Sequence, residues 1–128
     1  SFGFSPAVRA DGVTPAADPH LPQPLWFKDY AVDVEQADPD SMLALYRAAL
    51  AIRQESLTAT RDTTAEQVDM GDDVVAYTRA AVGGRVFTSI TNFGNAPVAL
   101  PDGSVVLASG PLTPEGQLPT DTSAWVVQ

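Results

Sequence analysis

Paired carboxylates are the first residues in this sequence whose types and spacing could do chemistry. Asp33 and Glu35 form one pair, and Asp38 and Asp40 form a second. Two carboxyl groups flanking a glycosidic bond are what glycoside hydrolysis requires, one as acid and one as base or nucleophile. Asp38 and Asp40, however, directly precede a helical pattern, where carboxylates serve as helix caps. We therefore assign no catalytic residue within this chain.

The other ionisable residues predict neither a metal centre nor an activated nucleophile. His20 is the only histidine and cysteine is absent, so zinc and thiol chemistry lack their usual groups. The aspartates of residues 69–73 lack the twelve-residue calcium pattern with its closing Glu, which favours a solvated turn. Gly83-Gly84 precedes no helical pattern, which excludes a phosphate-binding loop. We expect no metal and no cofactor.

Trp125 leaves two interpretations open. It stands in an expected closing strand, residues 122–127, where a large aromatic side chain is more often part of the core. An exposed Trp at this place would instead offer a platform on which a sugar ring stacks. The exposure of Trp125 is therefore the observation that separates a core residue from a binding residue.

Composition limits the classes of partner. The net charge of −9 argues against nucleic acid and anionic membrane surfaces. No run of residues approaches the ~18 consecutive apolar residues that a transmembrane helix needs. The absence of cysteine leaves the compartment open, and a cytoplasmic location is the default expectation.

The elements that would position these residues begin with a proline-rich lead. Residues 1–37 contain five prolines, and this composition predicts neither a helix nor a central strand there. A helix is expected over residues 39–56, with Asp38 as its capping carboxylate and Pro39 in its first turn. A single helix of this length is marginal in water, so its apolar stripe needs a partner surface.

After residue 58 the hydrophobic period changes from helical to alternating. Turn residues separate the alternating segments, which predicts short antiparallel strands in a sandwich or half-barrel. The expected strands are residues 66–70, 74–81, 85–93, 97–100, 104–108 and 122–127. We expect one region over residues 1–58 and a second, a β-domain, over residues 59–128.

Six short motifs follow one another along the chain. They are Phe2-Gly3-Phe4-Ser5, Leu21-Pro22, Val34-Glu35-Gln36, Asp38-Pro39-Asp40-Ser41, Tyr77-Thr78-Arg79 and Asn92-Phe93-Gly94. In their order and spacing, these motifs resemble the C-terminal segment of family 13 glycoside hydrolases, closest to the α-glucosidase and oligo-1,6-glucosidase group. The resemblance extends over nearly the whole chain. One departure is His20, which stands where the family usually has Trp before Leu-Pro.

This resemblance implies an α+β fragment of a larger enzyme. Residues 1–58 would be the Pro-rich loop and last helix of a (β/α)₈ barrel, and residues 59–128 an antiparallel β-sandwich C-terminal domain. The intact enzyme would hydrolyse α-glucosidic bonds in oligosaccharides with retention, through a covalent glycosyl-enzyme. The family's catalytic carboxylates lie on earlier barrel strands, so this segment would be structural and non-catalytic.

The implied partners are the remainder of the catalytic barrel and an α-linked gluco-oligosaccharide. Within this chain the resemblance offers only Phe2 and Phe4 as substrate-binding residues, at the rim of the pocket. Linkage preference, and hydrolysis against transglycosylation or isomerisation, depend on residues outside the sequence.

A free-standing β-sandwich module that binds carbohydrate or protein is the competing interpretation. It requires a self-sufficient fold with exposed aromatic side chains. A β region of about 70 residues without disulfide or metal is close to the lower limit for such a fold.

Overall fold

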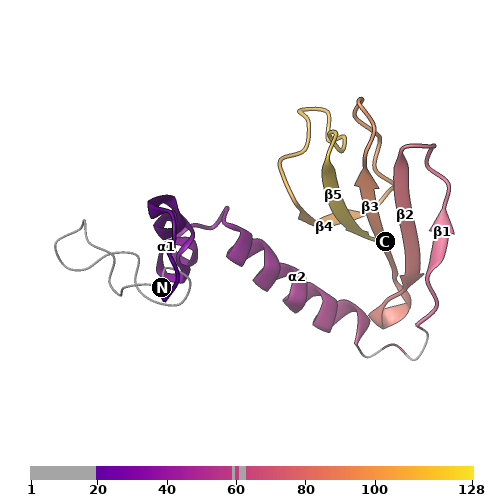
Figure 1. Cartoon of the computed structure of the whole chain (residues 1–128). Coiled ribbons are helices and arrows are strands. Elements are labelled where there is room, and N and C mark those ends of the chain that lie inside the picture. The colour runs from indigo at the N-terminus through magenta and orange to yellow at the C-terminus, as the bar shows by residue number, and fades with distance from the viewer. Residues whose placement is uncertain (1–19, 59, 61–62) are drawn as a thin grey trace. The chain divides into compact units, whose positions relative to one another are not determined.

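The computed structural model describes residues 20–58, 60 and 63–128. The chain divides into two compact units, residues 1–48 and 49–128. The α+β class expected from the sequence is confirmed, because helical elements precede a single antiparallel sheet (Figure 1). None of the helices in the described part of the chain has the length and apolarity that a transmembrane span requires. The helical elements are η1 (Leu25–Tyr30), α1 (Val32–Ala37) and α2 (Met42–Leu57).

The first unit contains helical structure where the prolines predicted none. Pro24 stands at the N-cap of η1, and α1 follows η1 after the buried Ala31. The prediction was wrong because the prolines stop at Pro24 and return only at Pro39, so the intervening residues can all donate backbone hydrogen bonds. Phe2 and Phe4, the expected pocket-rim residues, lie outside the described residues.

A serine, and not the expected aspartate, caps α2. The hydroxyl of Ser41 accepts a hydrogen bond from the backbone N–H of Ala44 at 3.1 Å and donates one to the carbonyl of Glu35 at 2.7 Å. It therefore satisfies one group at the end of α1 and one at the start of α2. Asp38 is used locally instead, since its carboxylate accepts from the N–H of Asp40 at 2.9 Å. This turn delays the start of α2 to Met42.

The second unit is built on an open sheet of five antiparallel strands in the order β1-β2-β3-β5-β4 (Figure 1). Each strand lies within one of the segments expected from the alternating pattern. The turn expected at Gly83-Gly84 joins β2 to β3, and both glycines have positive φ. The strands are β1 (Glu66–Val68), β2 (Val74–Ala80), β3 (Val86–Asn92), β4 (Ser104–Ala108) and β5 (Thr122–Val127).

The expected sandwich of two sheets is not observed, because the described residues form a single sheet. The sixth expected strand, residues 97–100, is reduced to a single bridge between Val98 and Leu118. Prolines at positions 97, 101 and 119 flank these paired residues, and proline cannot donate to a strand ladder. Irregular segments therefore take the place of a second sheet.

One side of the sheet, the core face, packs against these irregular segments. Leu118 is fully buried against the core-face residues of β2, β3 and β5. Val98, Leu100 and Leu112 pack against the cluster that these residues form. The core-face residues in this cluster are Val74, Ala76, Ile90, Ala124 and Val126.

The other side, the outer face, is covered only in part. Successive strand residues point to opposite sides, so Phe87 lies on the outer face beside the core-face residue Thr88. Phe87 is buried with Ala81, and the end of α2 packs on it through Ile52 and Leu57. Apolar packing therefore attaches the C-terminal end of α2 to the sheet.

The edge strand β4 is irregular. Its register against β5 shifts between Val105 and Leu107, which marks a bulge. Gly103, just before β4, has φ +135°, and a Cβ there would meet the carbonyl oxygen of Val127 at 2.8 Å. Only glycine fits this close approach of two backbones.

A buried asparagine connects β3 to the irregular segments. The side-chain amide of Asn92 donates to the carbonyls of Ala96 at 2.9 Å and Leu118 at 3.1 Å, and its oxygen accepts from the N–H of Gly94 at 2.9 Å. Asn92 is fully buried. Its three partners are all backbone groups. The side chain therefore supplies hydrogen bonds that strand pairing does not supply in these segments.

Replacing Asn92 with alanine is expected to lower the free energy of unfolding by about 3 kcal/mol, because three backbone groups lose their partner. Urea unfolding followed by circular dichroism measures the loss. The matched control is Asn95→Ala at an exposed site three residues away, with an expected change within about 0.5 kcal/mol. Equal effects of the two substitutions would contradict the role given to Asn92.

Candidate functional site

Of the carboxylate pairs singled out in the sequence, Asp33 and Glu35 lie in α1, and Asp38 and Asp40 lie in the turn between α1 and α2. Asp33, Asp38 and Asp40 are exposed, and Asp38 closes its own turn. The general acid of a glycosidase is held in a protected apolar pocket beside its partner carboxylate. The exposed side chains of Asp33, Asp38 and Asp40 have no such surroundings.

The other sequence candidates also have local structural roles. His20 is exposed at the beginning of the first described segment, and no group of three His, Cys, Asp or Glu side chains in the described residues could hold a metal ion. The carboxylate of Asp69 accepts from the N–H of Gly71 at 3.1 Å, and the carbonyl of Gly71 accepts from the N–H of Val74. This is a polar turn that leads into β2.

A hollow on the outer face is the most distinctive surface feature of the second unit, and we call it the outer hollow. Its volume is about 240 Å³. Leu57 at the end of α2 lies on one side, and Phe87 and Trp125 form an apolar floor. Tyr77, which is 45% exposed, stands at its border. Two arginines, Arg53 and Arg79, also line it.

The register of the sheet brings these side chains together. Arg79 pairs with Phe87 across β2 and β3, and Tyr77 pairs with Ser89, which in turn pairs with Trp125 of β5. All five residues therefore share the outer face, one strand beside the next. The alternating pattern predicted which residues of each strand share one side of the sheet. The pairing of β3 with β5 could not be predicted, because no local sequence pattern indicates it.

Trp125 has features of both a core residue and an exposed residue, the two interpretations left open by the sequence. It is half-buried, and its ring contacts Phe87 edge-on, with ring centroids 5.3 Å apart and an interplanar angle of 62°. This T-shaped contact is typical of core packing. The remainder of the ring lines the outer hollow.

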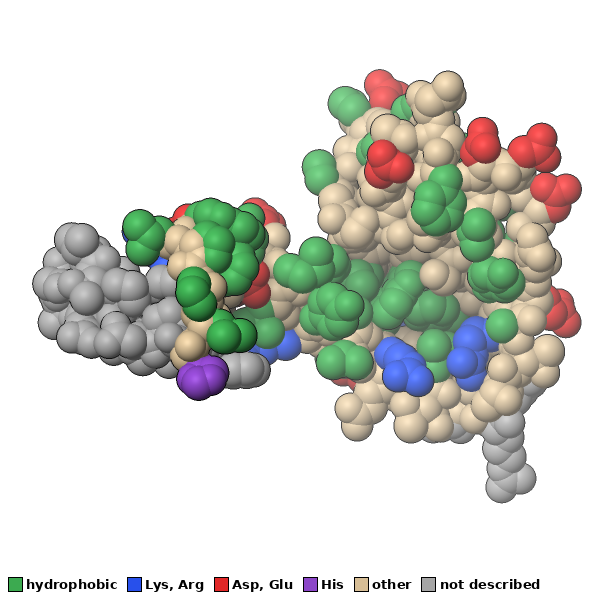
Figure 2. All heavy atoms as spheres, in the orientation of Figure 1, with side chains coloured by type: hydrophobic (Ala, Val, Ile, Leu, Met, Phe, Trp, Pro, Cys, Tyr) green, Lys and Arg blue, Asp and Glu red, His purple; other side chains and the backbone are tan. Residues whose placement is uncertain are grey.

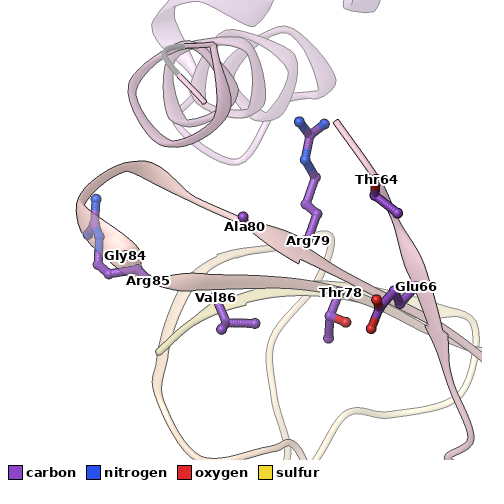
Figure 3. Close-up of a pocket in the computed structure, with 8 residues that line it drawn as sticks. All are labelled: Thr64, Glu66, Thr78, Arg79, Ala80, Gly84, Arg85 and Val86. Carbon is purple, nitrogen blue, oxygen red and sulfur yellow. The ribbon is translucent and has the colours of Figure 1, made fainter. Parts of the chain in front are cut away.

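A second hollow of about 310 Å³ lies at the β1 edge of the same unit. Figure 3 shows that Glu66 and Thr78 point to one side of the sheet there, while Arg79 points to the opposite side. Arg85 lies at the turn and donates from Nε to the carbonyl of Val82 at 3.0 Å. The guanidinium of Arg79 is therefore directed to the outer face, where Arg53 and Leu57 also lie.

Comparison with known proteins gives matches of fold. No protein-family model and no curated protein matches the sequence. Trehalulose synthase MutB from Pseudomonas mesoacidophila MX-45 matches 95% of this chain with 24% of its own, at a TM-score of 0.65 and 23% identity. A MutB mutant in complex with Tris matches 98% of this chain with 25% of its own, at a TM-score of 0.67 and 24% identity.

A putative alpha amylase from Salmonella typhimurium matches 80% of this chain with 17% of its own, at a TM-score of 0.55 and 19% identity. The chain thus spans about a quarter or less of the length of these structures. It has the fold of the matched segments of these structures. This agrees with the order of motifs noted in the sequence, and at these identities the likeness concerns the fold.

Replacing Phe87 with alanine is expected to detach the end of α2 from the sheet, because Ile52 and Leu57 pack against the cluster that Phe87 forms with Ala81 and Val127. We expect a loss of about 3–5 kcal/mol in stability. The amides of residues 52–57 should exchange with deuterium faster, as measured by mass spectrometry. Phe93→Ala, at a site that is 63% exposed, should leave both quantities unchanged. Unaltered exchange at residues 52–57 in Phe87→Ala would refute this attachment.

Proposed function

We propose that this chain is the C-terminal segment of an α-glucosidase-like family 13 enzyme, in which it completes and supports the catalytic (β/α)₈ barrel. The intact enzyme would cleave α-glucosidic bonds in oligosaccharides with retention, using two carboxylates that lie outside these residues. The segment itself would perform no chemical step.

The observation that carries this proposal is the uncovered apolar stripe of α2. Met42, Tyr46 and Leu50 recur every four residues and therefore lie on one side of the helix. They are 59%, 64% and 59% exposed, and Ser56 is the one buried residue of the helix. A helix of this length depends on packing of its apolar side for its stability. This apolar side therefore needs a partner surface beyond the described residues that pack on α2.

The matched structures make a barrel the natural partner. Their chains are about four times as long as this one, so three quarters of a comparable polypeptide would be available to cover α2. The motif Asp38-Pro39-Asp40-Ser41, which opens the last barrel helix in the family, stands directly before α2. These two observations support assigning α2 as a barrel helix.

The activity is proposed from two sources that differ in detail. The motifs favour the α-glucosidase group, whereas two of the matched structures are trehalulose synthases, so formation of trehalulose is the second candidate. Product analysis separates the two: glucose release from an α-linked disaccharide indicates hydrolysis, and an isomeric disaccharide without net glucose release indicates the synthase.

The denatured intact mass of the natural protein is the first test. We expect a polypeptide about four times as long as this segment, with α-glucosidase activity on maltose. A natural polypeptide that ends at these 128 residues, folded and soluble, would refute the proposal and leave a free-standing binding module.

We further propose that Phe2 and Phe4 line the rim of the substrate pocket. Phe4→Ala in the intact enzyme should lower kcat/KM for maltose about tenfold, since an apolar contact to the sugar is lost. Phe93→Ala, on an exposed turn after β3, is the matched control and should leave kcat/KM unchanged. Wild-type kcat/KM in Phe4→Ala would remove this role.

A further inference from the structure

The turn before β4 holds an aspartate whose side chain has no partner among the described residues. Asp102 is exposed, and the group that is held in place is its backbone carbonyl, which accepts a hydrogen bond from Nε2 of Gln128 at 2.5 Å. Figure 2 shows the wider pattern, in which the acidic side chains visible on the sheet-bearing unit stand at its surface, mostly apart from the basic ones. The carboxyl group of Asp102 is therefore open to reaction.

The next residue supplies a nucleophile. In the part of the chain that the structure describes, no backbone carbonyl accepts a hydrogen bond from the N–H of Gly103. Glycine has no Cβ, so nothing on this residue hinders the approach of its nitrogen to the carboxyl carbon of the residue before it. The sequence has one other Asp-Gly pair, Asp11-Gly12, which lies outside the described residues.

The fold requires the glycine of this pair. Gly103 has φ +135°, and a Cβ on it would meet the carbonyl oxygen of Val127 at 2.8 Å and Cγ1 of Val126 at 2.9 Å. A larger residue, which would slow attack by the backbone nitrogen, therefore does not fit here. The close approach that begins β4 thus keeps a reactive Asp-Gly pair at the surface.

We propose that Asp102 is a site of spontaneous isomerisation to isoaspartate in the folded protein. The nitrogen of Gly103 forms a bond to Cγ of Asp102, and a carboxyl oxygen leaves as water with the amide proton. Water then adds to the resulting succinimide at the carbonyl next to Cα and breaks the original peptide bond to Gly103. The backbone afterwards runs through Cβ of residue 102, and Cα carries the carboxylate. The water lost in the first step is regained in the second, so the mass is unchanged.

The product does not fit the start of β4. Isoaspartate lengthens the backbone by one carbon beside Gly103, which already lies against the backbone of Val127. It also turns the carbonyl that Gln128 bonds into a carboxylate. Ser104, the first residue of β4, pairs with Val127, so the displacement acts on the register at this end of the strand. We therefore expect the amides of residues 104–108 to exchange faster with deuterium after isomerisation.

Ageing of the full-length protein at neutral pH, followed by peptide mapping, tests the proposal. We expect a second peptide of unchanged mass and altered retention that contains position 102. A methyltransferase specific for isoaspartyl groups should esterify it. Asp121 is the matched internal control, because it is also exposed in a turn that leads into a strand but is followed by the β-branched Thr122. Asp121 should stay unmodified.

Two variants connect the product to its chemistry. Asp102→Glu should abolish it, because the same attack would have to close a six-membered ring. Asp102→Asn should form it faster, because ammonia leaves in place of water. Hydrogen exchange of residues 104–108 should rise on ageing in the wild type and stay constant in Asp102→Glu.

A synthetic peptide of residues 98–106 gives the rate for the same sequence without the fold. A rate in the folded protein close to that of the peptide supports the proposal. Isomerisation of the peptide while Asp102 of the folded protein stays intact would overturn it, since the fold would then protect the pair. Equal amounts of isoaspartate at positions 102 and 121 would overturn it as well, because Gly103 would then have no role. None of these outcomes depends on the activity of the intact enzyme.

Discussion

The buried amide of Asn92 is the interaction on which the β unit most depends. The sheet has only one layer, and the segments that cover its core face are interrupted by prolines that cannot join a ladder. Asn92 bonds to three backbone groups in those segments, including the carbonyl of the fully buried Leu118. Leu118 in turn belongs to the core cluster on that face. A side-chain amide thus holds in place the irregular layer that excludes water from the sheet.

The two sides of the sheet differ in what completes them. The core face is closed by the chain's own residues, from Val98 to Leu118. The outer face is closed only where Phe87 meets the end of α2. Beyond that contact Arg53, Tyr77 and part of Trp125 remain accessible. The same contrast holds along α2, whose apolar stripe is exposed. Both surfaces fit a segment that folds locally and is stabilised by a larger body.

The sequence predicted the strands well because glycine and proline turns bound each of them. It missed the helical turns of residues 25–37. The prediction treated residues 1–37 as uniformly proline-rich, although residues 25–37 contain no proline. It also predicted a strand over residues 97–100, which the structure reduces to a single bridge because prolines flank the paired residues. The outer hollow could not be predicted, because it depends on β3 pairing with β5, and no local pattern specifies partners so far apart. The motif containing Asn92 was recognised, but its hydrogen bonds required the structure.

The bulge in β4 bears on how the sheet meets other proteins. An edge strand with regular spacing offers unpaired backbone groups to which another strand can add. The exposed side chains of Val105 and Val106 would favour such an addition. The shift of register between Val105 and Leu107 interrupts the regular spacing of those groups. Strand addition at the β4 edge is therefore disfavoured, and the bulge protects this side of the sheet from pairing with strands of other molecules.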